Sequence, residues 1–232
     1  MKRDRFAELC PTGSKFSSST ARRRDRRSIA ALALALALGL LVASVEVVRA
    51  AEASWSLARE ENGIVVYTRP VVGSGIREFR GSAVVAASVD SIRALLRDAD
   101  HFKDWFPNLS ESRLLGREGN VAYQYYVLDL PWPVSDRDNV LRSETTIDSA
   151  SGRISIQVTA APDYHPEQPE RVRVRRALSQ WLLEPVTPGQ TRVTFTMHLD
   201  PGGGVPQWLI NAQVVETPFD ALTNMRVAVS GR

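Results

Sequence analysis

The stretch LDLPWPVSDRDNVLRSE, at Leu128–Glu144, decides how the chain is interpreted. The residues around it, Val121–Leu130 and Asn139–Ile147, are rich in apolar and β-branched types and predict two strands. The prolines that flank Trp132 lack backbone donors, so the chain cannot continue here as part of a central ladder. The sequence therefore predicts a loop that carries a large aromatic residue out of the sheet and ends in the charged turn Ser135–Asp138.

Alternation of apolar and polar residues predicts further strands on both sides of this loop. They are expected at Ile64–Arg69, Ile76–Val85, Ser112–Glu118, Ile154–Thr159, Arg171–Arg175, Gln180–Pro185 and Val193–Leu199. The first two should form a hairpin, and the alternating arginines of 171–175 predict a face in solvent. The whole pattern is typical of an antiparallel sheet with one face covered.

Two helical segments are expected between the early and late strands. Ser88 is a good N-cap, and the apolar residues after it recur at helical spacing until about Asp98–Asp100. Phe102, Trp105 and Phe106 then predict a short second helix with an aromatic face. For Trp105 and Phe106, packing in the core is favoured over direct contact with a ligand.

A long amphipathic helix is predicted at the C-terminus. The breaker Asp200–Gly204 precedes Pro206, which suits the first turn of a helix. Apolar residues from Trp208 to Val229 then form one stripe, and Pro218 should kink the helix. A helix of this kind after a series of strands is expected to lay its stripe on the sheet.

The first 50 residues predict a targeting segment. Residues 1–28 carry nine Lys and Arg, Ile29–Val45 is almost entirely apolar, and small residues follow near Ala50. This is the pattern of a cleaved signal peptide, with an uncleaved membrane anchor as the alternative. In both cases the basic flank places residues 51–232, which suit a single domain, outside the cytoplasm.

The charge of the chain changes when this segment is set aside. Residues 51–232 hold 19 basic and 22 acidic residues, a net charge of about −3, against +3 for the whole chain. The body therefore has no basic excess to predict nucleic acid as a partner. The single cysteine, Cys10, lies in the leader, so the body has no disulfide or thiol chemistry.

No catalytic or cofactor motif stands out. His101, His165 and His198 lack a second ligand at metal-binding spacing, so no metal site and no cofactor is predicted. The segment Asp136–Asp138 could hold a catalytic group, but an ion-paired turn is favoured. A curved sheet and a long helix can instead enclose an apolar cavity for a small molecule.

Several segments together resemble one known family. They are Trp55, Asn62–Ile64 and Tyr67, the WPVSDRD loop, Trp181–Pro185, DPGGGVPQWLIN at Asp200–Asn211, and the helix with Thr217-Pro218, Leu222 and Met225-Arg226. In order and spacing they are similar to START domains, the lipid-transfer domains related to steroidogenic acute regulatory protein. The resemblance runs from Trp55 to Arg226, nearly the whole body.

The resemblance implies an α+β helix-grip fold, in which a curved antiparallel sheet encloses an apolar cavity covered by the C-terminal helix. It makes Pro131–Asp138 the omega loop beside the tunnel mouth, packed on that helix. Sterol-binding relatives have a buried acid and arginine where this chain has Gln124 and Ser143, so sterol specificity is not expected.

The resemblance gives two sets of candidate site residues. The ligand is expected to contact Trp105, Gln124, Tyr126, Leu128, Ser143, Phe195, Met197, Val215, Phe219 and Leu222, of which the last three would close over it. The expected gate consists of Trp132, Asp136, Arg137 and Asp138. Trp132 would either touch the bilayer interface or pack under the C-terminal helix, and packing is slightly favoured.

The leading hypothesis is a monomeric, non-enzymatic lipid carrier or sensor that touches membranes transiently. One alternative is an enzyme of the same superfold, with Tyr126, Asp129 or Arg137 as candidate groups. Another is an interaction module whose cavity is filled by its own side chains.

Overall fold

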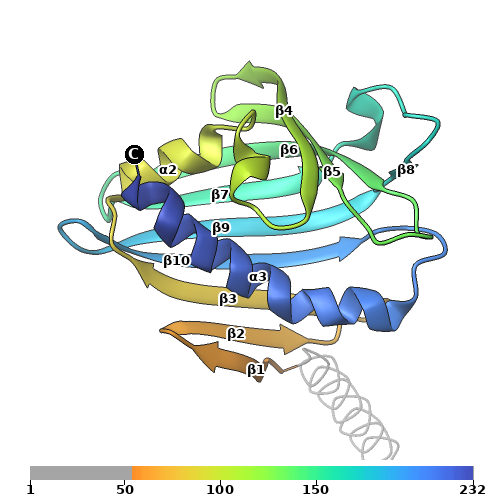
Figure 1. Cartoon of the computed structure of the whole chain (residues 1–232). Helices are drawn as coiled ribbons and strands as arrows, with labels where there is room; N and C mark the ends of the chain where they lie inside the picture. Colours follow the sequence, from red (N-terminus) through yellow and green to blue (C-terminus); the bar gives the residue numbers. More distant parts are fainter. Residues whose placement is uncertain (1–53, 232) are drawn as a thin grey trace, which may run out of the picture. The chain divides into compact units, whose positions relative to one another are not determined.

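The computed structural model describes residues 54–231. The predicted signal peptide or anchor at residues 1–50 lies outside the described residues. Within residues 54–231, no helix is both long enough and apolar enough to cross a membrane. The described residues form an α+β domain in which a long C-terminal helix lies against a curved antiparallel sheet, as predicted (Figure 1).

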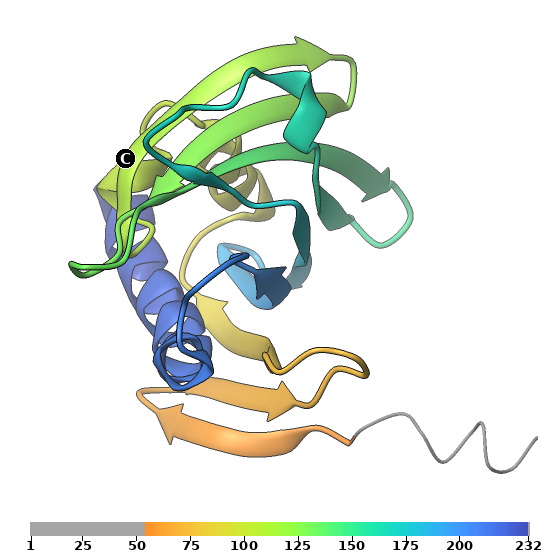
Figure 2. The ribbon, with the colours of Figure 1, turned by 90° about the vertical axis from the view of Figure 1, so that its right-hand side faces the viewer.

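The sheet has ten strands in the order β1-β2-β3-β10-β9-β7-β6-β5-β4, and the short β8 pairs with β6 in parallel. Figure 2 shows how its two ends curl toward each other. The strands are β1 Ser56–Glu61, β2 Ile64–Arg69, β3 Glu78–Val85, β4 Leu109–Glu118, β5 Val121–Leu128, β6 Arg137–Asp148, β7 Arg153–Ala160, β8 Val172–Arg173, β9 Arg176–Thr187 and β10 Gln190–Asp200. The helices are α2 Val89–Arg97 and α3 Gln207–Ser230, with single 3₁₀ turns η1 Phe102–Asp104 and η2 Pro162–Tyr164.

The helix α3 packs on β2 and β3, where the strands alternate buried and less buried residues. Gly81 of β3 is the closest point, because a Cβ there would lie 2.8 Å from Pro218 Cβ and 3.1 Å from Leu222 Cδ1. Arg226 then donates hydrogen bonds to the carbonyls of Asn62 and Val84, at 2.8 and 3.1 Å. Glycine at position 81 therefore lets the helix approach the sheet.

The edge strand β1 was not predicted. Its sequence SLAREE is mostly polar and mostly exposed, so it lacks the alternation that marks a half-buried strand. It is held by pairing with β2 across Asn62 and Gly63, which both have positive φ. This Asn-Gly turn is a typical connection of a two-residue hairpin.

The outer face of β5 and β6 carries a small second core. Tyr125, Val127 and Val140 form it, and the segment after β7 covers it. In that segment Arg173 is 6% exposed and bonds both carboxylate oxygens of Asp138, at 3.0 and 2.8 Å. The prediction that the alternating arginines of 171–175 face solvent is therefore wrong for Arg173, since a buried carboxylate holds it, and the strand there is limited to Val172–Arg173.

The predicted charged turn at Ser135–Asp138 is also only partly right. Arg137 and Asp138 are the first residues of β6, and their side chains are 2% and 0% exposed. Their charges made a surface turn the simplest interpretation, because unpaired charges are rarely buried. Each is instead buried with hydrogen-bond partners that include a residue more than 30 positions further along the chain, Gly203 for Arg137 and Arg173 for Asp138.

We expect Gly81→Ala to destabilise the domain by about 1–3 kcal/mol, because the added methyl group overpacks the contact with Pro218. Gly203→Ala is the matched control, since a Cβ at Gly203 meets no atom within 4 Å. Urea denaturation measures both. Equal stability of the two variants would contradict the close contact between α3 and β3.

We expect Asp138→Ala to destabilise the domain by about 3–5 kcal/mol, because it leaves Arg173 buried without its carboxylate. Glu144→Ala removes the half-exposed partner of Arg142 and should change stability by less than about 1 kcal/mol. Thermal unfolding followed by circular dichroism compares them. A difference too small to measure would mean that the buried pair does not hold the outer segment.

Candidate functional site

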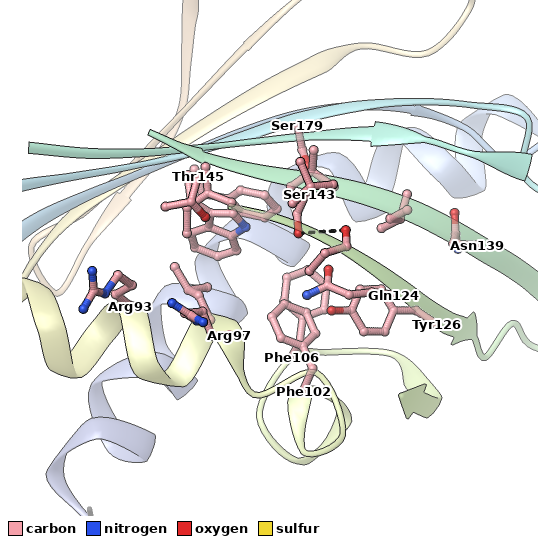
Figure 3. Close-up of a pocket in the computed structure, with 18 of the residues that line it drawn as sticks. Arg93, Arg97, Phe102, Phe106, Gln124, Tyr126, Asn139, Ser143, Thr145 and Ser179 are labelled. Carbon is pink, nitrogen blue, oxygen red and sulfur yellow. Dashed lines mark hydrogen bonds between the residues drawn. The ribbon is translucent and has the colours of Figure 1, made fainter. Parts of the chain in front are cut away.

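A cavity of about 370 Å³ lies between the concave face of the sheet and the segment that contains α2 and η1. Strands β5, β6, β7, β9 and β10 provide one wall, and Leu96, Phe102 and Phe106 contribute to the other (Figure 3). The wall is formed in this way because the inward-facing residues of these strands are apolar or neutral, with a period of two. The volume lies at the small end of the range of about 300–1,000 Å³ that ligand pockets occupy.

Aromatic rings make the floor of this cavity rigid. Trp181 of β9 stacks on Phe195 of β10 with ring centroids 3.8 Å apart. Phe102 of η1 stacks on Tyr126 of β5 at 4.9 Å and on Phe106 at 4.9 Å. Such contacts stabilise an apolar wall of fixed shape.

The polar groups inside the cavity are neutral. Gln124 and Ser143 are 6% and 8% exposed and lie on the same face of neighbouring strands, and the Ser143 hydroxyl donates to the carbonyl of Ala122 at 3.3 Å. Asn139 is 3% exposed, and its side-chain oxygen has no hydrogen-bond partner among the described residues. The cavity can therefore meet a ligand with hydrogen bonds in its interior but with no buried charge there.

Burial keeps Tyr126 in its neutral form. The side chain is 6% exposed, and desolvation raises the pKa of its hydroxyl far above the usual range, with a smaller contribution from Asp100. At neutral pH it is thus a phenol that can donate a hydrogen bond, and it cannot act as a base.

The most exposed residues of the cavity wall lie at one end of the cavity, where it opens to solvent. The exposed members of the wall are Arg97, Arg117, Gly119, Asn120 and Ile147. All five belong to the end of α2, the end of β4, the β4–β5 turn or the far end of β6. We call this opening the mouth; it lies at the opposite end of β5 from the loop that follows Leu128.

A second cavity of about 100 Å³ lies under the first turns of α3. Ile210 and Val214 of the helix line it, together with Asp129 and Leu130 of the loop. Its wall shares four residues with the larger cavity. These are Phe106, Leu128, Met197 and Leu199. Only side chains therefore separate the main cavity from the region between the loop and α3.

Six of the ten residues predicted to contact the ligand line the main cavity. They are Gln124, Tyr126, Leu128, Ser143, Phe195 and Met197. Period-two alternation accounts for their place in the cavity wall, because every second residue of a strand faces the same side.

The other four, Trp105, Val215, Phe219 and Leu222, do not line it. The three helix residues pack with the main core instead. Phe219 lies under the guanidinium of Arg59 in β1, with 3.4 Å between Arg59 Cζ and the ring centroid. Leu222 contacts Gly81 of β3. Trp105 packs with its edge against Phe102 and Trp181. The expectation that α3 closes over the ligand is thus not met by these residues.

The residues missed by sequence reasoning are chiefly Phe102, Phe106, Trp181 and three arginines, Arg93, Arg97 and Arg117. A signal existed for two pairs. Phe102 and Phe106, like Arg93 and Arg97, are four apart and share a face of a helical turn. Trp105 does not share the spacing of four residues that places Phe102 and Phe106 on one face. The spacing alone could therefore have shown that Trp105 is not in the cavity wall.

The predicted gate residues lie outside the main cavity, near the start of α3. Trp132 is 92% exposed, so the alternative in which it packs under the helix is wrong. Asp136 accepts a hydrogen bond from the backbone N–H of Leu130 at 3.3 Å and closes the loop. Arg137 donates to the carbonyls of Pro201 and Gly203, at 3.4 and 2.6 Å, and so joins the loop to the segment before α3.

The three groups considered for catalysis are not brought together. Tyr126 lines the main cavity, Asp129 lines the smaller one, and Arg137 lines neither. Burial lowers the pKa of Arg137, but its guanidinium is bound to backbone carbonyls. Over residues 54–231 no cluster of three His, Cys, Asp or Glu could hold a metal ion.

Comparison with known proteins gives one consistent result. The family model of the START domain matches residues 37–230. An uncharacterized protein of Pseudomonas aeruginosa is 37% identical over 178 residues, which cover 77% of this chain and 88% of that protein. The phosphatidylcholine transfer protein of Rattus norvegicus is 28% identical over 163 residues, covering 68% of this chain and 76% of that protein.

A solved structure agrees with this result. The STAR-related lipid transfer protein of Xanthomonas axonopodis, a fragment of residues 25–204, superposes with a TM-score of 0.71 at 42% identity. The match covers 76% of this chain and 98% of that fragment. The curved sheet with its long C-terminal helix is therefore an arrangement that the two proteins share.

Proposed function

The chain belongs to the START domain family, and on this premise we propose that it binds one lipid or other hydrophobic small molecule in the 370 Å³ cavity. The family is known for lipid binding and transfer. We propose that this protein acts as a carrier or a sensor outside the cytoplasm, as the basic and apolar residues at 1–50 suggest.

The observation that carries this proposal is the cavity itself. Its wall is mostly apolar and aromatic, with a few neutral polar groups inside, which is the usual composition of a site for an apolar ligand. The side chains leave this volume open, which disfavours the alternative of an interaction module with a filled interior. The neutral Tyr126 and the dispersed Asp129 and Arg137 likewise give no support to catalysis.

The loop and the start of α3 are the proposed route of exchange with a membrane. Trp132 and Trp208 are 92% and 72% exposed and lie beside the same shallow groove. Large aromatic residues are favoured at the interface between a bilayer and water. In a monomer that touches a membrane there, movement of Phe106, Leu128, Met197 and Leu199 would join the main cavity to the smaller cavity under the start of α3.

We expect Ser179→Trp to remove most of the bound lipid, because Ser179 lines the cavity and the indole would occupy it. A loss of about 1.4 kcal/mol lowers affinity tenfold, and filling the cavity should exceed this value. The measurement is lipidomic mass spectrometry of the purified body, residues 51–232. Leu178→Trp is the matched control, since Leu178 directly precedes Ser179 in β9 and is 50% exposed on the outer face.

Two outcomes of this experiment would contradict the proposal. One is a wild-type protein that carries no lipid and takes up none from vesicles. The other is equal lipid content in Ser179→Trp and Leu178→Trp, with both variants folded by circular dichroism. The second result would place the lipid outside the cavity.

We expect Trp132→Ala together with Trp208→Ala to slow lipid transfer between vesicles several-fold while leaving the melting temperature nearly unchanged. Both side chains are mostly exposed, so they contribute little to the core, but they can enter the bilayer interface. Transfer of pyrene-labelled fatty acid and pyrene-labelled phosphatidylcholine measures the rate.

The control for this pair is Val72→Ala, which shortens an 87% exposed apolar residue on the β2–β3 turn. Its transfer rate should equal that of the wild type. A normal rate in the double Trp variant, with a clearly lowered melting temperature, would mean that the two residues stabilise the fold and do not meet the membrane.

A further inference from the structure

Three arginines stand at the mouth of the cavity. Arg93 and Arg97 lie one turn apart on α2, and both point toward the cavity (Figure 3). Arg117 comes from β4, and its guanidinium donates to the carbonyl of Arg97 at 3.1 Å. The end of α2 and the start of the β4–β5 turn therefore bring three positive charges to one opening.

These charges are not balanced by acids in the cavity wall. No Asp or Glu occurs among the described residues that line the cavity. Arg93 pairs with Asp90 at 3.0 Å, a carboxylate that is 79% exposed, while neither Arg97 nor Arg117 has an ion pair within residues 54–231. Burial, followed by the charges of Arg117 and Arg93, lowers the pKa of Arg97. The mouth is thus a place where like charges accumulate and an anion would relieve their repulsion.

Other nearby carboxylates are engaged elsewhere. Asp98 accepts from His101 at 2.8 Å, and Asp100 accepts from the backbone of Leu114 at 2.9 Å. Glu118 follows Arg117 directly, so the alternation of the strand directs it to the other side. These three carboxylates therefore do not neutralise the positive charge of the arginines at the mouth.

The space behind the mouth is long and narrow. Along β6 the wall runs from Thr145, near the mouth, to Asn139 at the closed end, which is about 20 Å at 3.3 Å per residue. Half of the hydrocarbon core of a bilayer is about 15 Å thick. One acyl chain of a membrane lipid therefore fits this length, whereas the volume of about 370 Å³ favours a single chain over two.

We propose that the cavity takes a single-chain anionic amphiphile, whose phosphate or carboxylate lies among Arg93, Arg97 and Arg117 while its chain extends toward Asn139. This assignment rests on the proposed function and adds the class of ligand and its orientation. Guanidinium groups bind carboxylate and phosphate with paired, charge-assisted hydrogen bonds.

The reverse orientation is unfavourable. A carboxylate at the closed end would be buried beside Asn139 and Gln124, which can offer hydrogen bonds but no positive charge. Burying an unpaired carboxylate costs far more than leaving it at a solvated opening beside arginines. The neutral interior and the charged mouth thus both direct the head of the ligand outward.

The test compares palmitate with methyl palmitate, which has the same chain and no charge. The affinity for each ligand is measured by its displacement of the neutral fluorescent probe N-phenyl-1-naphthylamine from the purified body, residues 51–232. Because charge-assisted hydrogen bonds are strong, Arg97→Gln with Arg117→Gln should weaken palmitate binding by about tenfold or more. The affinity for methyl palmitate should not change, and this unchanged value also shows that the variant is folded.

The control variant is Arg192→Gln, which removes an exposed arginine on the outer face of β10. It should bind both ligands like the wild type. Palmitoyl lysophosphatidic acid should follow palmitate, and inorganic phosphate alone should not displace the probe.

Three results would overturn the assignment and leave lipid binding intact. They are equal loss of palmitate and methyl palmitate in the double variant, unchanged palmitate affinity in it, and displacement of the probe by inorganic phosphate alone. A double variant that keeps its palmitate affinity but loses binding to anionic phosphatidylglycerol vesicles would show a membrane-docking surface instead. If no amphiphile displaces the probe even from the wild type, the proposed function itself fails.

Discussion

The close contact between α3 and β3 at Gly81 determines where the cavity can lie. Pro218 and Leu222 approach the sheet there within ordinary contact only because residue 81 has no side chain. The helix is thereby held over β2 and β3, and Arg226 anchors it to the turn before β2. The remaining concave face, from β10 to β5, is left for α2 and η1, whose short elements cannot fill it. The cavity exists because α3 packs closely on β2 and β3, whereas α2 and η1 cover the rest of the concave face only in part.

The distribution of charge follows the same division. The main core under α3 is apolar, and on the outer face of the sheet, under the segment after β7, the buried Asp138 is tightly bonded to Arg173. Where the cover by α2 and η1 is incomplete, the interior is neutral and the charges stand at the solvated edge, on Arg97 and Arg117. Desolvation explains both arrangements, because a buried charge needs a bonded partner and a charge at an opening does not.

The sequence was sufficient for those parts of the structure that depend on local periodicity. Most of the strands, although not β1, the N-cap at Ser88, the Asn62-Gly63 turn and the long C-terminal helix follow from spacing and turn chemistry within a few residues. The inward-facing residues of β5, β6 and β10 follow from alternation, and for that reason these candidates lie in the wall of the cavity. The predicted family supplied the arrangement of the elements.

What could not be predicted depends on partners far apart in the chain. Arg173 looks like a surface residue until its pairing with Asp138, 35 residues away, is known. The stripe of α3 indicates that the helix is buried but not which strands it covers, and Phe219 could have faced a ligand as well as β2. Gly81, an isolated glycine inside a strand, is a sequence signal for the position of α3, since such a glycine often marks the close approach of another part of the chain. With α3 placed there, the cavity lies beside α2 instead, and Arg93 and Arg97, which share one face of α2, line it.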